Sequence, residues 1–183
     1  MTRRDTYTVD VAGVKRDLPL FEVAPGVRIA ILNILGDTEL VAAAAGALAP
    51  KLAELQPDVL VTAETKSIPL VHELATLLDL PYIVLRKDYR PYMGDALQVE
   101  TVSITTGRPQ TLYLDEKDRA LLQGKHVILV DDVISTGSTL EAMRQVVAEA
   151  GGTVVAEGAV FTEGDRAKWH GIVAVGHLPV FDS

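Results

Sequence analysis

The sequence contains no cysteine, which excludes disulfides, thiolate nucleophiles, zinc–thiolate sites and iron–sulfur clusters. It is also poor in basic residues, because 17 Lys and Arg stand against 25 Asp and Glu and leave a net charge of −8. A nucleic-acid partner is therefore not expected, since such binding depends on neutralising phosphates. No secretory signal is readable near the N-terminus, and the longest apolar stretch, residues 40–50, is about half of a bilayer span. These absences predict a cytoplasmic protein without a membrane partner.

Several enzyme motifs are absent as well. The sequence has no G-x-S-x-G, no P-loop pattern and no G-x-G-x-x-G, which disfavours a serine hydrolase, a P-loop protein and a dinucleotide-binding Rossmann domain. Its four histidines do not show the H-x-x-x-H spacing of a histidine-based metal site. The chemistry must therefore come from other residues.

What the sequence does contain is the pattern of one α/β domain covering residues 1–183. The chain shows no repeat and no linker, and 48% of its residues are apolar. The first 35 residues read as short strands and turns, and from residue 58 apolar runs such as 126–130 alternate with helical patterns. Alternation of this kind predicts a central, mainly parallel sheet flanked by helices.

One segment interrupts this alternation. Residues 99–105 and 110–114 are polar and rich in threonine, and they flank the turn residues Thr106-Gly107-Arg108-Pro109. They predict a β-hairpin inserted between two strand–helix units. Ligands of open α/β sheets bind beyond the carboxyl ends of the strands, so the hairpin is a candidate lid. A passive surface ribbon is the alternative.

The densest chemical signal is the run VILVDDVISTGSTL at residues 127–140. An apolar strand delivers Asp131 and Asp132, and a turn rich in hydroxyls and glycine then opens a helix. Free backbone N–H groups, a helix N-terminus and Ser/Thr hydroxyls are what a phosphate monoester requires. The two carboxylates would repel phosphate and suit sugar hydroxyls or a divalent cation instead. Together these groups indicate a site for a ribose 5-phosphate.

A capping interpretation of the same turn is the alternative. Ser138 and Glu141 form an S-x-x-E capping box, and strand-to-helix turns commonly use Asp, Ser, Thr and Gly. Two adjacent carboxylates followed by Ser-Thr-Gly-Ser-Thr exceed what a cap needs, so we favour the binding interpretation of the whole segment.

Two further segments follow predicted strands. Thr62-Ala63-Glu64-Thr65-Lys66-Ser67 precedes a helix N-terminus and suits an anion, although Lys66 alone reads as a solvated lysine and Ser67 as a simple N-cap. Glu64 is either an acceptor for metal-bound water or a structural acceptor. Farther along, Leu85-Arg86-Lys87-Asp88-Tyr89-Arg90 places cations at a strand end, where they either meet an anionic leaving group or only add surface charge.

Over residues 58–163 these segments resemble the type I phosphoribosyltransferases, and residues 127–140 resemble their signature for phosphoribosyl pyrophosphate (PRPP). The resemblance implies that Asp131 and Asp132 bind the ribose hydroxyls either directly or through Mg²⁺, which they would contact with or without an intervening water. It implies a 5-phosphate site at Ser135, Thr136, Gly137, Ser138 and Thr139. It also implies a pyrophosphate site at Glu64, Thr65, Lys66, Ser67, Arg86, Lys87 and Arg90.

The fold implied by this resemblance is the type I phosphoribosyltransferase fold, in which residues 1–35 and the C-terminal tail form a small hood over a nucleobase. The implied activity is Mg²⁺-dependent transfer of the phosphoribosyl group from PRPP to a purine, with release of pyrophosphate, in purine salvage. A homodimer is implied by the family. The hairpin is the expected lid, with Ser103, Thr105 and Thr106 in it.

Adenine is the favoured acceptor, because the spacing and the Arg86-Lys87 pair are most similar to adenine phosphoribosyltransferases. Two departures stand against it. The Phe-Arg-Asp-type segment of those enzymes is replaced by Ile31-Leu32-Asn33-Ile34-Leu35-Gly36-Asp37, and their lid glutamate is replaced by Thr105. A threonine cannot serve as a general acid or base near neutral pH.

A second function class stays open. Residues 64–88 are also similar to the PRPP-binding effector domain of a purine-operon repressor, which has the same fold and binds PRPP as a signal. The alternative is therefore a PRPP-sensing regulatory protein without turnover. The net charge and the short chain, which leaves no room for a separate DNA-reading module, favour the enzyme.

Overall fold

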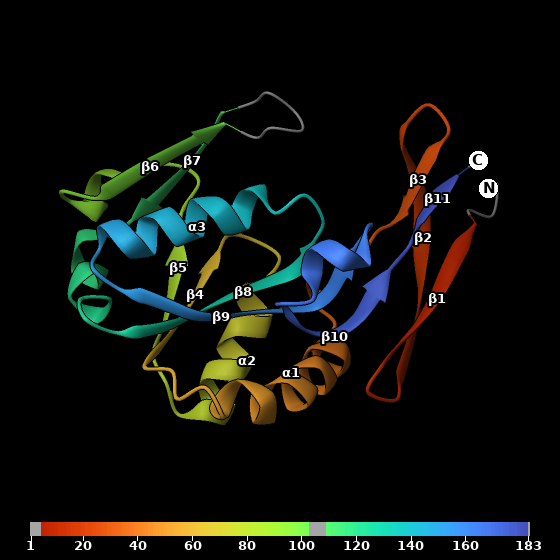
Figure 1. The fold of residues 1–183 in the computed structure, drawn as a ribbon, viewed down its shortest axis with the longest axis horizontal. Coiled ribbons are helices and arrows are strands. Elements are labelled where there is room, and N and C mark those ends of the chain that lie inside the picture. The colour runs from red at the N-terminus through yellow and green to blue at the C-terminus, as the bar shows by residue number, and fades with distance from the viewer. Residues whose placement is uncertain (1–4, 103–108, 183) are drawn as a thin grey trace.

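A five-stranded, entirely parallel sheet forms the centre of the molecule, seen in a computed structural model that describes residues 5–102 and 109–182 (Figure 1). The strand order is β10–β9–β8–β4–β5, so the chain moves outward in one direction from β4 and in the other from β8. The loops that follow these two neighbours therefore diverge, which leaves a crevice at their carboxyl ends. The strands are β4 (Val59–Ala63), β5 (Tyr82–Leu85), β8 (His126–Ile134), β9 (Thr153–Glu163) and β10 (Val173–Leu178).

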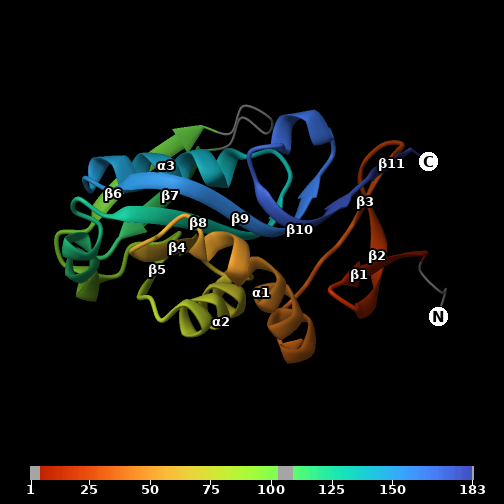
Figure 2. The same ribbon diagram turned by 60° about the horizontal axis from the view of Figure 1, so that its bottom comes forward.

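Helices cover both faces of this sheet, as Figures 1 and 2 show. Helices α1 (Thr38–Ala53) and α2 (Ile68–Leu78) lie on one face, and α3 (Ser138–Glu149) lies on the other. In α3 the buried residues Leu140, Met143, Val146 and Val147 recur at helical spacing. The predicted α/β sheet with flanking helices is confirmed. No helix within the described ranges has the length and apolarity needed to cross a membrane.

A second, antiparallel sheet stands at one end of the molecule and shares no strand with the central sheet (Figure 1). We call it the hood; its order is β1–β2–β3–β11. Buried Val9, Val11 and Leu18 belong to the same apolar cluster as residues of α1. The strands are β1 (Thr6–Val11), β2 (Val14–Ala24), β3 (Val27–Ala30) and β11 (Val180–Asp182).

The predicted hairpin is present as the antiparallel pair β6 (Leu97–Val102) and β7 (Pro109–Leu114). Val99, Leu112 and Leu114 are buried in the same apolar cluster as the inner face of α3, so the base of the hairpin is part of the core. The expected lid residues Ser103, Thr105 and Thr106 lie outside the described residues. Three short 3₁₀ helices complete the fold: η1 (Pro91–Met93), η2 (Glu116–Leu121) and η3 (Arg166–Trp169).

Two local expectations need correction. Asp131 and Asp132 lie inside β8 and not after it, because β9 is long enough to pair with β8 as far as Ile134. Ser138 does not cap α3: Gly137 occupies the N-cap position, and Ser138 is the first helical residue. Strand β2 continues through Pro19, whose carbonyl accepts a hydrogen bond from the N–H of Ile31 (3.0 Å).

Candidate functional site

A cavity of about 370 Å³ opens where β4 and β8 end. A smaller pocket adjoins it and shares Asp131, Val133 and Thr139 with it. The turn after β4, the cation after β5, the acidic pair and the loop before α3 therefore meet in one place. The larger cavity is lined by Ala63, Glu64, Thr65, Lys66, Ser67, Lys87, Asp131, Asp132, Val133 and Thr139.

The acidic pair lies on an open edge of the sheet. The last residue pair between β4 and β8 is Thr62 with Val130, so β8 continues past the end of β4 and exposes this edge to the cavity. Asp131 and Asp132 are neighbours in a strand, and their side chains leave it on opposite faces; both nevertheless line the cavity.

The electrostatics of the pair point to a ligand. Burial and then the neighbouring carboxylate of Asp132 raise the pKa of Asp131 to about 7. Asp131 Oδ1 accepts a hydrogen bond from the Asp132 N–H (2.8 Å). Asp132 Oδ2 lies 3.2 Å from Lys66 Nζ, but it is buried and makes no hydrogen bond within the described part of the chain. The pair therefore offers acceptor atoms that the protein itself does not satisfy.

These carboxylates also fit Mg²⁺, which proteins usually bind through one or two carboxylates together with substrate oxygens and water. Among residues 5–102 and 109–182, no group of three or more His, Cys, Asp or Glu side chains could hold a metal ion. A cation at Asp131 and Asp132 would therefore depend on a ligand for its remaining coordination.

The loop between β8 and α3 has the geometry of a phosphate site. Gly137 has φ +79°, a left-handed conformation that favours glycine. The N–H groups of Thr136, Gly137 and Thr139 donate to no backbone carbonyl within the described residues. The Thr136 and Ser138 hydroxyls lie 3.0 Å apart. Free N–H groups at the start of a 12-residue helix favour an anion.

Trp169 of η3 packs beside this loop. A Cβ atom on Gly137 would come within 3.0 Å of its ring, and its indole N–H donates to the carbonyl of Glu163 (2.9 Å). The ring also packs against the apolar cluster around α3. Trp169 therefore couples the loop before α3 to the core, a contact that the sequence did not indicate.

The turn after β4 presents its backbone to the cavity. The Glu64–Thr65 peptide bond is cis, and the N–H groups of Thr65, Lys66 and Ser67 donate to no backbone carbonyl of the described chain. The Ser67 hydroxyl does not cap α2. It donates instead to the Ala63 carbonyl (2.9 Å) and lies 2.7 Å from the Thr62 hydroxyl. Ser67 can therefore contribute only its backbone.

The two cations after β5 have different surroundings. Glu64 pairs with Arg86, whose Nε lies 2.6 Å from Oε2, and it accepts a hydrogen bond from the Lys87 N–H (2.7 Å). Glu64 therefore connects the turn after β4 to the end of β5, while it also lines the cavity. Arg86 faces a different cavity of about 530 Å³, which it shares with Tyr92, whereas Lys87 lines the cavity of the acidic pair.

Arg90 is not brought to the cavity. It precedes η1, and its N–H contacts Met93 Sδ (3.3 Å).

Two polar contacts that the sequence did not indicate join distant segments at the site. Lys66 Nζ donates to the carbonyl of Leu32 (3.2 Å), and Gln110 of β7 contacts the Thr139 hydroxyl at 3.4 Å.

The fold and the residues around the cavity agree with the family to which the sequence is matched. The sequence profile of the phosphoribosyl transferase domain matches residues 32–172, and the chain belongs to that family. The resemblance found in the sequence is thereby confirmed.

Relatives with established names fall into two groups. The purine biosynthesis transcriptional activator PurR of Lactococcus lactis is 32% identical over 142 residues, which is 78% of this chain and 51% of that protein. The hypoxanthine/guanine phosphoribosyltransferase of Methanocella paludicola is 33% identical over 118 residues, 64% of this chain and 58% of that protein. The chain thus spans about half the length of the curated relatives it matches.

Solved structures show the same fold. The adenine phosphoribosyltransferase of Rhodothermus marinus matches with a TM-score of 0.66 at 24% identity, covering 94% of both chains. The enzyme of the same name from Thermoanaerobacter pseudethanolicus gives 0.64 at 21% identity, covering 96% of this chain and 95% of that one. At these identities the likeness concerns the fold.

Proposed function

We propose that this domain transfers the 5-phosphoribosyl group of PRPP to a purine and releases pyrophosphate. One observation carries the proposal: the acidic pair, the loop before α3, the turn before α2 and Lys87 line two adjoining pockets that share Asp131, Val133 and Thr139. Each group fits a different part of PRPP.

In the proposed complex two helix N-termini hold the two anionic ends of PRPP. The backbone of Thr136, Gly137 and Thr139 binds the 5-phosphate at the start of α3. The backbone of Thr65 to Ser67 and the ammonium of Lys87 bind the pyrophosphate at the start of α2. Asp131 and Asp132 accept hydrogen bonds from the ribose hydroxyls, so the sugar is fixed between the two anions.

In the reaction a bond forms between a ring nitrogen of the purine and the anomeric carbon, the bond from this carbon to the pyrophosphate oxygen breaks, and the proton of that ring nitrogen is released to solvent. The protein contributes by orienting the two reactants and by stabilising negative charge on the leaving group. Bound Mg²⁺ would neutralise charge on the pyrophosphate oxygens. Asp131 and Asp132 are the residues proposed to face it.

The proposal is tested with a panel of adenine, guanine, hypoxanthine, xanthine, uracil and orotate, each mixed with Mg-PRPP and monitored for pyrophosphate. We expect release with at least one purine and none with the pyrimidines. Adenine is the first candidate because of the Arg86-Lys87 spacing. The absence of release with every base would contradict enzymatic activity.

A second function is favoured by the likeness to PurR over 78% of this chain. The domain would then bind PRPP as a signal. Calorimetric titration together with the base panel separates the two proposals. A sensor binds Mg-PRPP in the titration but releases no pyrophosphate with any base of the panel.

The different surroundings of the two cations give a further prediction. Lys87→Met should weaken binding of Mg-PRPP by roughly tenfold or more, because a charge-assisted contact is lost, with little change in Tm. Arg86→Met should lower the Tm, because Glu64 has a side chain only 16% exposed and loses its partner. Binding should fall less in Arg86→Met than in Lys87→Met. Equal loss of binding in both variants would contradict this division of roles.

We also propose a homodimer. Tyr82, Tyr89 and Tyr92 lie near β5 and η1 with exposed fractions of 37%, 46% and 71%. Exposed aromatic residues are typical of interfaces. Sedimentation analysis should give twice the mass of the chain, and Tyr92→Glu should shift the protein toward the monomer.

A further inference from the structure

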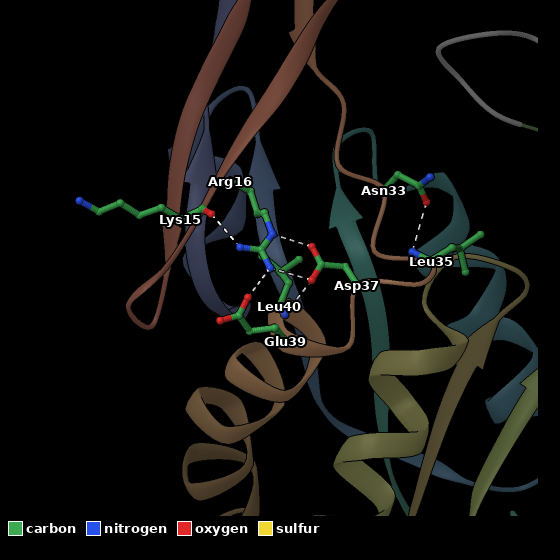
Figure 3. A network of polar contacts seen from close by, with 7 residues as sticks. All are labelled: Lys15, Arg16, Asn33, Leu35, Asp37, Glu39 and Leu40. Atoms are coloured by element: carbon green, nitrogen blue, oxygen red, sulfur yellow. Dashed lines mark hydrogen bonds and ion pairs between the residues drawn. The ribbon is translucent and has the colours of Figure 1, made fainter.

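Arg16 joins the hood to the start of α1, as Figure 3 shows. Its guanidinium on β2 makes two hydrogen bonds to the carboxylate of Asp37, from Nε to Oδ2 (2.7 Å) and from Nη2 to Oδ1 (2.9 Å). Nη2 also contacts Glu39 Oε2 at 2.7 Å. Two parallel bonds between a guanidinium and a carboxylate restrict direction as well as distance.

Asp37 has a second role that makes it a firm point of attachment. It is the N-cap of α1, and its Oδ1 accepts a hydrogen bond from the Leu40 N–H (3.1 Å). The hydrogen bonds from Arg16 are the largest cause of the lowered pKa of Asp37. The carboxylate therefore stays charged at neutral pH and ties the hood to a helix packed on the central sheet.

The linker between β3 and α1, residues 31–37, leads from this contact to the cavity. Its residues Leu32 and Ile34 are buried, and the Asn33 side chain accepts a hydrogen bond from the Leu35 N–H at 3.3 Å (Figure 3). The Leu32 carbonyl accepts a hydrogen bond from Lys66, whose ammonium lies 3.2 Å from Asp132. These contacts place the hood beside the sugar site, so a rotation of the hood would move it relative to an acceptor bound there.

Attachment and orientation of the hood have different causes. Val9, Val11 and Leu18 hold it to the core by apolar burial, which is strong but not directional. Within the described residues, Arg16 makes the ion pairs between the hood and α1. Loss of Arg16 should thus leave the hood attached while permitting it to change its angle.

We propose that Arg16 is a positioning residue that fixes the orientation of the hood through Asp37 and thereby determines how well the acceptor purine is held beside the sugar site. This inference rests on the proposed function and on the expectation, implied by the family resemblance, that the hood covers the nucleobase. It assigns a role in purine binding to a residue that does not line the PRPP cavity.

The test uses two variants that remove the paired bonds by different routes. Arg16→Gln removes the guanidinium. Asp37→Ser removes the carboxylate but keeps a good N-cap for α1, so the helix is preserved. In both variants we expect KM for the purine to rise by roughly tenfold or more, because misplacement of a reactant is costly. KM for PRPP and kcat should change by less than about threefold, a split that general destabilisation would not produce.

Glu39→Gln is the matched control. Glu39 has a side chain that is 72% exposed, and its replacement leaves the bonds between Arg16 and Asp37 in place, so kinetic constants should stay within about twofold. Unchanged KM for the purine in Arg16→Gln and Asp37→Ser, or a parallel rise in KM for PRPP, would overturn the proposal.

Hydrogen exchange distinguishes failure of this inference from failure of the proposed function. If the parent protein turns over no purine, the enzymatic proposal fails, but the orientation of the hood is still measurable. In that case amides of β1 and β2 should exchange faster in Arg16→Gln and Asp37→Ser than in the parent, with the amides of β4 and β8 unchanged. Equal exchange in the hood of all variants would overturn the role of Arg16.

Discussion

Replacement of both Asp131 and Asp132 with asparagine is expected to weaken binding of Mg-PRPP by about a hundredfold or more, because two charged acceptors of the ribose hydroxyls are lost together. The fold should survive the change. Asparagine has nearly the same shape, and its side-chain oxygen at position 131 can still accept the hydrogen bond from the backbone N–H of residue 132. Calorimetric titration with Mg-PRPP measures the loss.

The pH dependence of stability supplies a control for folding. The pKa of Asp131 is raised to about 7 by burial and by Asp132, so the folded state holds its proton more tightly than the unfolded state does. Ionisation therefore costs folding free energy, fully above pH 7 and not at all below the ordinary pKa of aspartate, near 4. Without Mg²⁺, Asp131→Asn should have a higher Tm than the parent at pH 8, by a few degrees.

Two outcomes would contradict these assignments. Parent-like affinity of the double variant for Mg-PRPP would remove the acidic pair from the sugar site. A Tm advantage of Asp131→Asn that is the same at pH 8 and pH 4 would show that the ionisation of the buried Asp131 carboxyl is not its cause.

The second large effect is expected at Gly137. An alanine there must adopt φ +79°, at a cost of about 1 kcal/mol, and its Cβ would lie 3.0 Å from the ring of Trp169. The loop must therefore move, and the N–H groups that face the smaller pocket move with it. We expect Gly137→Ala to reduce affinity for PRPP and for ribose 5-phosphate by more than about tenfold.

Gly124→Ala separates strain from binding. Gly124 has φ +70°, a Cβ there would meet nothing within 4 Å, and the residue precedes β8 at the end of the sheet opposite the site. Both alanine variants should lose similar stability from backbone strain. Only Gly137→Ala should lose affinity, and comparable loss in Gly124→Ala would refute a local role for the loop before α3.

The central sheet and the strand–loop–helix segment of the candidate site could be predicted from the sequence because their signals are local. Apolar strands followed by turns repeat along the chain, and the run from Val127 to Leu140 contains the acidic pair and the loop before α3 within 14 consecutive residues. In such a segment the order along the chain and the arrangement in space are nearly the same, so periodicity and residue type suffice.

The remaining features depend on residues that are far apart in sequence. Glu64 pairs with the side chain of Arg86, 22 positions away, and accepts a hydrogen bond from the backbone N–H of Lys87, 23 positions away. These two contacts give Arg86 and Lys87 different roles. Arg16 reaches Asp37 across 21 positions. No local pattern contains these pairs, because tertiary folding alone decides which charges become neighbours. The sequence also could not show that the Ser67 hydroxyl contacts Thr62 and Ala63 instead of capping α2.

The hood and the central sheet have no strand in common, and this separation has an evolutionary consequence. Under the proposed function, substitutions in the hood can retune the choice of purine while the hydrogen-bond ladders that support the sugar and phosphate contacts stay intact. A lineage that loses the acceptor altogether keeps a working PRPP receptor. Divergence into catalysts and regulators therefore requires no redesign of the scaffold they share.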